Sequence, residues 1–189
     1  NIMAKIPARE EAYELLKKYN KSESLINHAL AVEAVMRYAA RQKNEDEEKW
    51  GVIGLIHDLD YEMYPDRHCQ MTEKILREEN WDEEYIRAVL SHGWGIVTDI
   101  EPKTELEKTL FAIDELTGLV TACALVRPSK SVNDLKVKSV KKKWKVKSFA
   151  AGADREIIQK GADMLGMELS ELIELVIMGM REKSDELGL

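Results

Sequence analysis

The sequence predicts an all-α protein, a helical bundle with a helical extension at its C-terminal end. Helix-favouring residues dominate the 189-residue chain, which has only 4 prolines and 10 glycines. Apolar residues recur at helical spacing along most segments. Serine and aspartate residues suited to cap helices precede several of these segments. We expect seven to nine helices and no clear strand.

The first half of the chain is expected to contain five helices, over residues 8–19, 22–42, 46–59, 68–79 and 82–91. Pro7 marks the start of the first helix, because proline favours the first helical turn. Ser22 or Ser24 caps the second helix, and Asp82 caps the fifth. The third helix starts near Asp46 and carries a strongly apolar run. A loop containing Pro65 follows it.

The second half begins with a loop, because His92-Gly93-Trp94-Gly95 interrupts the helical pattern. A long helix over residues 105–126 stops before Pro128. Residues 131–151 are expected to be irregular and basic, with short helical turns at most. Asp154 and Ser170 are the expected caps of the last two helices, which end near Met164 and Lys183. We therefore divide the chain into a core domain, residues 8–127, and an extension, residues 128–189, packed on the same core.

Composition restricts the location and the partners of the protein. Apolar residues make up 44% of the chain, enough for a real core, but no stretch approaches the roughly 20 apolar residues of a membrane span. No secretion signal is visible at the N-terminus. The only cysteines, Cys69 and Cys123, do not form a disulfide framework and suit a reduced cytosol. We expect a cytoplasmic protein without membrane contact.

The net charge of −7 is unevenly distributed. Residues 136–147 contain seven lysines and no acidic residue, so the rest of the chain is strongly acidic. This distribution argues against nucleic-acid binding over the whole surface and leaves room for one local anion site.

The chemistry is concentrated around the four histidines, His28, His57, His68 and His92. His28 lies on an apolar helical face, where a core histidine is the simpler interpretation. His57-Asp58 closes an apolar helix, and an unpaired carboxylate buried there would be costly. A simple C-terminal cap is the alternative, although the helix dipole disfavours aspartate at that end.

Asp114 lies inside the long helix over residues 105–126, on the same face as Leu110 and Thr117. Aspartate has a poor helix propensity in such a position. A hydrogen-bonded interior acid, an exposed acid and a metal ligand are the three interpretations of this residue.

The ordered set His28, His57-Asp58 and Asp114 resembles the HD superfamily of metal-dependent phosphohydrolases. The resemblance covers about residues 20–125 and implies an all-α fold with a metal between helices. His68 and His92 stand where the dinuclear branch of that superfamily has two extra histidines, as in its diadenosine-tetraphosphate hydrolases and cyclic-dinucleotide phosphodiesterases. The alternative is that these two are surface histidines. The full ligand set implied is His28, His57, Asp58, His68, His92 and Asp114, with Asp58 bridging two metals.

The resemblance also implies the reaction. Imidazole and carboxylate ligands suit iron, manganese, nickel or zinc, whereas magnesium prefers oxygen-rich sites. We expect one or two such ions at a catalytic centre around His57 and Asp58, with metal-activated hydroxide as the nucleophile. The expected substrate is a phosphoester or phosphoanhydride of a nucleotide or another small phosphorylated molecule. P-loop, GxGxxG and GxSxG motifs are missing, so other nucleotide-binding and serine-hydrolase mechanisms lack support.

Residues outside the ligand set are weaker candidates. Arg127, Lys130 and Lys138 are expected to bind substrate phosphate, although a solvated basic loop explains this segment equally well. Three aromatic residues could line a pocket or fill the core, namely Tyr61, Tyr64 and Trp94. Asp60 and Glu62 are candidates for an outer shell of acids.

Two functions of other classes remain open at this stage. One is a di-iron oxygenase on the same fold, and the other is a non-catalytic module that binds a metal or a ligand. The apolar helix near residues 169–180 packs either on the core or against a second subunit of a homodimer.

Overall fold

The computed structural model describes residues 3–189, and this part of the chain is all-α, as the sequence predicts. A short 3₁₀ helix covers Pro65–Arg67. The α-helices in chain order are α1 Arg9–Tyr19, α2 Glu23–Gln42, α3 Glu47–Ile56, α4 Gln70–Glu78, α5 Glu83–Ser91, α6 Glu105–Leu125, α7 Val137–Trp144, α8 Arg155–Leu165, α9 Leu169–Arg181 and α10 Ser184–Leu187.

Side-chain caps start four of the helices at the residues that the sequence analysis names. Asp46 accepts a hydrogen bond from the backbone N–H of the first turn of α3, Asp82 does so for α5, and Asp154 for α8. Ser22 caps α2 in the same way. The prediction for Ser170 is wrong, because α9 starts at Leu169 and the carboxylate of Glu171 accepts from the backbone N–H at the helix start.

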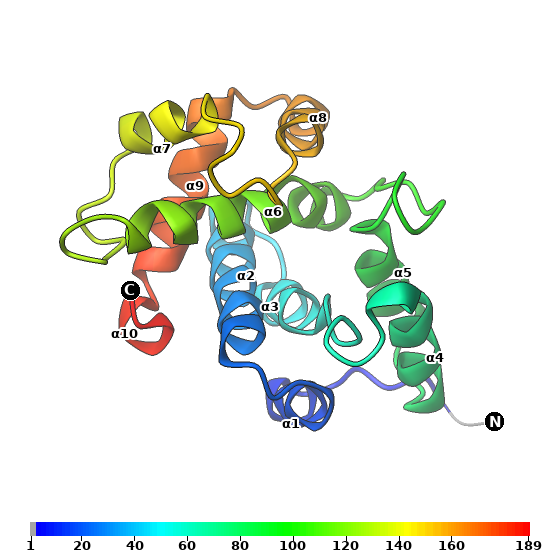
Figure 1. Ribbon diagram of the computed structural model, residues 1–189. Helices are drawn as coiled ribbons and strands as arrows, with labels where there is room; N and C mark the ends of the chain where they lie inside the picture. The colour runs from blue at the N-terminus through cyan, green and yellow to red at the C-terminus, as the bar shows by residue number, and fades with distance from the viewer. Residues whose placement is uncertain (1–2) are drawn as a thin grey trace.

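Helix α6 is the central element of the fold. In Figure 1 it crosses the molecule, with α7 and α8 on one side and α1 to α5 on the other. Its start is held by a capping box, in which Thr104 and Glu107 each bond the backbone N–H of the other. The buried Glu107 carboxylate also pairs with Arg87 of α5 at 2.8 Å. These contacts fix α6 relative to α5.

The C-terminal helices pack on the same core. A Cβ atom at Gly161 of α8 would lie 2.4 Å from Ala112 Cα, so only glycine lets α8 approach α6 this closely. Helix α9 approaches α2 in the same way, with Gly179 against Val35. Most apolar residues of α9 are therefore buried within this chain, among them Leu172.

Three segments differ from the sequence prediction. Helix α3 ends at Ile56, and a series of turns follows it. Helix α4 begins at Gln70, because Cys69 has a positive φ of 76° that interrupts a helix starting at His68. The basic segment contains α7, a complete two-turn helix. Among the described residues no helix has the length and apolar character needed to cross a membrane.

Candidate metal centre

Five separate segments bring the four histidines and two aspartates together. His28 comes from α2, and His57 and Asp58 follow the last turn of α3. The remaining three are His68 before α4, His92 at the end of α5 and Asp114 in the middle of α6. Their side chains expose between 0% and 23% of their surface. The low exposure of His68 and His92 argues against the alternative that these two are surface histidines.

One half of the cluster is built around Asp114. Its Oδ1 lies 2.9 Å from His28 Nε2 and 3.0 Å from His57 Nε2. Asp58 completes this half, with Oδ2 at 3.2 Å from His57 Nε2 and 3.7 Å from His28 Nε2. The possible ligand atoms of these four residues all lie within 4.8 Å of one another.

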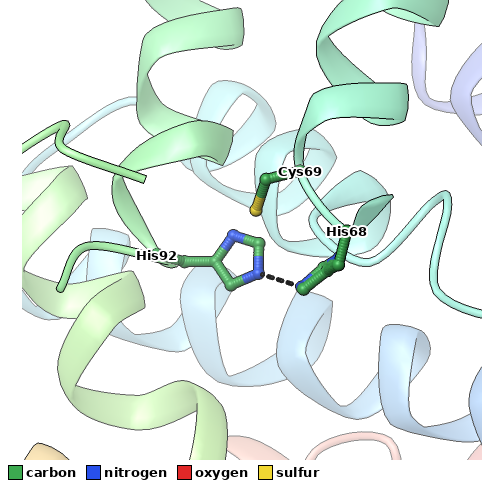
Figure 2. Close-up of side chains that lie close together, drawn as sticks. All are labelled: His68, Cys69 and His92. Carbon is green, nitrogen blue, oxygen red and sulfur yellow. Dashed lines mark hydrogen bonds between the residues drawn. The ribbon is translucent and has the colours of Figure 1, made fainter. Parts of the chain in front are cut away.

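The other half uses the second oxygen of the same carboxylate. Asp58 Oδ1 lies 3.3 Å from His68 Nε2 and 3.2 Å from His92 Nε2. The two imidazoles also face each other, as Figure 2 shows. Their Nε2 atoms are 3.2 Å apart. Asp58 thus directs one oxygen to each pair of histidines, which is the arrangement of a carboxylate that can bridge two ions.

Hydrogen bonds on the outer side of the rings orient three of the histidines. His57 Nδ1 donates to the Gly54 carbonyl at 2.7 Å, and His92 Nδ1 donates to the Val89 carbonyl. His68 Nδ1 donates to the buried Asp60 carboxylate at 2.7 Å. Because each Nδ1 carries the proton, each Nε2 is available to the centre. This donor set fits a divalent transition metal.

The electrostatics of the cluster also fit bound cations. Burial opposes a charge on His57, but the Asp58 and Asp114 carboxylates outweigh it and hold the His57 pKa well above its ordinary value. Burial likewise opposes the charge of His68, and hydrogen bonds to Asp58 and Asp60 raise its pKa to about 12. In the described residues the ion pairs of Asp58 and Asp114 involve histidine alone. Bound cations can supply the positive charge that these protonated histidines carry.

Asp60 and Glu62 have different roles in the structure. Asp60 is fully buried, and its second oxygen accepts a hydrogen bond from the Thr72 backbone N–H at 2.9 Å, which fixes it beside His68. Glu62 instead accepts from the backbone N–H groups of Lys21 and Ser22, just before α2. Asp60 therefore belongs to the surroundings of the cluster, and Glu62 belongs to a helix terminus.

Cys69 is a neighbour of the cluster that the sequence analysis left without a role. Its buried sulfur lies beside His92 in Figure 2, and its Sγ is within 4.8 Å of possible ligand atoms of His68 and His92. Burial raises the pKa of the Cys69 thiol, so the neutral thiol is favoured. The adjacency of Cys69 to His68 in the sequence was the one available signal.

A cavity of about 520 Å³ opens over the cluster. Besides five of the six cluster residues, all but His57, its wall contains Tyr61, Gly93, Ile96, Val97, Glu115, Gly118, Ala150, Gly152 and Ala153. The Tyr61 ring packs edge-on to His68, with centroids 5.3 Å apart. Trp94 lies outside this wall and packs against Phe111. Tyr64 also lies outside it.

Glu115 is a cavity residue that the sequence analysis missed. Burial is the main cause that raises its pKa to about 7, and the neighbouring carboxylates add to it, although the Asp154 backbone N–H donates to Glu115. In the sequence it resembles any exposed glutamate of a helix.

The structure does not bring the predicted phosphate-binding residues to this cavity. Arg127, Lys130 and Lys138 are absent from its wall. Arg127 pairs with Asp134 at 3.3 Å beyond the end of α6. It follows Asp114 by more than three helical turns, which corresponds to roughly 20 Å along the helix axis. This length of helix separates Arg127 from the cluster.

The comparisons with known proteins agree with this geometry. A family model for the HD domain matches residues 25–119, which is half of the chain. The chain belongs to the HD domain family. The matched residues include His28, the His57-Asp58 pair and Asp114, so the cluster lies within the HD domain. HD domains bind divalent metals, and the His/Asp groups of this HD protein could hold such an ion.

A curated relative extends over more of the chain. The tRNA (cytidine(56)-2'-O)-methyltransferase of Thermoplasma volcanium is 27% identical over 121 residues, which cover 63% of this chain and 36% of the relative. The HD protein thus spans about a third of the length of this relative. No solved structure gives a significant match.

Proposed function

We propose that the protein is a metal-dependent phosphohydrolase. It cleaves a phosphoester or phosphoanhydride of a nucleotide or another small phosphorylated substrate, with two divalent transition-metal ions held by His28, His57, Asp58, His68, His92 and Asp114. The observation that carries this proposal is the position of Asp58, whose two oxygens each face one pair of histidines at 3.2–3.7 Å.

The residues of the cluster and of the cavity have different parts in this proposal. The six side chains hold the ions, and the outer hydrogen bonds of His57, His68 and His92 keep Nε2 directed inward. Bound ions supply Lewis-acid charge for the phosphoryl oxygens and lower the pKa of water. Tyr61 and Gly118 border the space in which the substrate lies. We do not propose RNA as a substrate, because the cavity wall contains neither lysine nor arginine to bind a phosphate backbone.

The first test combines metal content with phosphate release. Protein loaded separately with Fe²⁺, Mn²⁺, Ni²⁺ or Zn²⁺ is expected to hold two ions per chain and to release phosphate from a panel of small phosphoesters. His57→Ala and Asp58→Ala are expected to reduce the rate by about three orders of magnitude or more, because residues that act as a unit lose most activity singly.

Asp134→Ala is the matched control, since it removes a carboxylate that pairs only at the surface with Arg127 and Ser129. Its rate should stay within about twofold of the original protein. Full activity in both cluster variants would refute the proposal. Metal-dependent oxygen consumption without phosphate release would favour the oxygenase, and tight metal binding without turnover would favour the binding module.

A further inference from the structure

A second cavity adjoins the one above the cluster. It has a volume of about 370 Å³ and lies between α2, α6 and the last three residues of the chain, from the end of α10 onward. Its wall contains Glu23, Ser24, Asn27, Ala31, Thr121, Leu125, Leu187, Gly188 and Leu189. His28 and Gly118 line both cavities. The two spaces therefore meet between α2 and α6, directly beside the cluster.

Gly118 sets the width of this junction. It lies inside α6, where glycine is less stable than alanine. Neither packing nor backbone conformation requires it, because a Cβ at this position meets no atom within 4 Å and its φ is not positive. Gly161 of α8 differs, since its added Cβ would collide with Ala112. The missing side chain of Gly118 thus keeps space open between the two cavities.

The second cavity offers hydrogen bonds but no cation. Among the described residues the Asn27 side-chain amide has no protein partner, and the Thr121 hydroxyl donates to the Thr117 carbonyl and keeps its acceptor capacity. His28 is the one cluster histidine whose Nδ1 has no protein partner in the described part of the chain. Lysine and arginine are absent from both walls, which contain the acids Glu23 and Glu115.

These features select an uncharged occupant. A second phosphate would lie beside carboxylates without a compensating cation, which is costly. An organic group with apolar faces and hydrogen-bonding edges matches Leu125 and Ala31 on one hand and Asn27 and Thr121 on the other. The volume of about 370 Å³ is within the range of small-molecule pockets, about 300–1,000 Å³.

We propose that the two cavities form one substrate groove. It binds a phosphomonoester whose single phosphate lies at the cluster and whose uncharged organic group, of the size of a nucleoside, passes Gly118 and lies between α2, α6 and α10. This inference rests on the proposed phosphohydrolase function, and it adds that polyphosphate chains are poor substrates.

The test compares one long and one short phosphomonoester. In the metal-loaded protein, adenosine 5′-monophosphate should have a kcat/KM at least about tenfold above that of methyl phosphate, and above that of adenosine 5′-triphosphate. Gly118→Leu should lower kcat/KM for adenosine 5′-monophosphate by about tenfold or more, mainly through KM, and lower kcat/KM for methyl phosphate by a clearly smaller factor. Ala122→Leu is the matched control, because Ala122 lies one turn later on α6 and lines neither cavity.

A binding measurement separates this inference from the proposed function. Adenosine, which has no phosphate, should bind the original protein in an NMR titration, more weakly in Asn27→Ala by roughly three- to tenfold, and not detectably in Gly118→Leu. Adenosine binding without any hydrolysis would support the groove and refute the phosphohydrolase. Hydrolysis of methyl phosphate and adenosine 5′-monophosphate at equal rates, unaffected by Gly118→Leu, would overturn the groove and leave the phosphohydrolase intact. Preference for the triphosphate would also overturn it.

Discussion

At the scale of single residues, Asp60 decides how one ligand of the cluster is oriented. Its two oxygens accept from the His68 ring and from the Thr72 backbone N–H, so the carboxylate cannot turn away from His68. It is fully buried, and a buried carboxylate is stable only with such partners. Its position therefore depends on α4, which supplies Thr72, as well as on the turn after α3.

We predict that Asp60→Asn lowers the affinity of the protein for one of its two metal ions. The amide keeps the shape but loses the charge that orients and polarises His68, and such outer partners typically contribute about 10–100-fold to metal affinity. A calorimetric Mn²⁺ titration should show two sites in the original protein and one site weakened by that factor in the variant.

Glu62→Gln is the control for Asp60→Asn, since it alters an acid two residues away that bonds only backbone N–H groups before α2. It should change thermal stability slightly and leave both affinities as they are. Equal Mn²⁺ affinity in Asp60→Asn and the original protein would contradict the role of Asp60.

At the scale of elements, α6 has one face that packs closely against a neighbouring helix and another face that borders open space. Its Ala112 face requires the close approach of α8, which Gly161 allows. Its Gly118 face requires the absence of a side chain where nothing packs. Two glycines associated with the same helix are thus present for different physical reasons.

We predict that alanine at these two positions shifts stability in opposite directions. Gly118→Ala should raise the free energy of unfolding by about 0.5–1 kcal/mol, because alanine restricts the unfolded chain and fits the open space. Gly161→Ala should lower it by about 1–3 kcal/mol, because the added methyl group overpacks the α6–α8 contact. Urea unfolding followed by circular dichroism measures both. Destabilisation by Gly118→Ala would show that this position is packed.

The helices themselves could largely be predicted from the sequence, because apolar periodicity and capping residues are local signals. The exception is α7, where Val137, Val140 and Trp144 recur at helical spacing but seven lysines in the segment suggest an irregular loop. The cap of α9 was misplaced because a glutamate can serve where a serine is the usual choice. Such errors concern boundaries rather than the class of fold.

The candidate site could be predicted only in part, for a related reason. The six cluster residues were recognisable because histidine is rare in this chain, because the His-Asp pair closes an apolar helix, and because their order, with Asp114, resembles the HD superfamily. Glu115 and Gly118 carry no comparable signal, since their importance depends on which elements meet beside α6. Arg127 was a candidate because it follows Asp114 by about three helical turns. That length of helix takes it away from the cavity wall, and it pairs with Asp134 instead.

At the scale of the whole molecule, the cluster takes its ligands from elements spread over the first two thirds of the chain. His28 belongs to α2 and Asp114 to α6, while His68 and His92 belong to the segments around α4 and α5. A ligand that binds the folded state alone stabilises it in proportion to the logarithm of its concentration over Kd. Metal bound here would therefore stabilise the entire fold.

We predict that metal loading raises Tm and that the increase is larger at pH 8 than at pH 6. In the metal-free protein the carboxylates hold the His57 pKa well above its ordinary value despite burial, and the His68 pKa is about 12. A metal must displace these protons, so proton and metal compete, and metal affinity rises with pH. At 100 times Kd the gain is about 2.7 kcal/mol, or roughly 5–11 °C for a chain of this size. Scanning calorimetry of metal-loaded and chelator-treated protein at both pH values gives the two increments. Asp58→Ala should show neither increment, and an increment that falls from pH 6 to pH 8 would mean that the protonated histidines are not the groups the metal replaces.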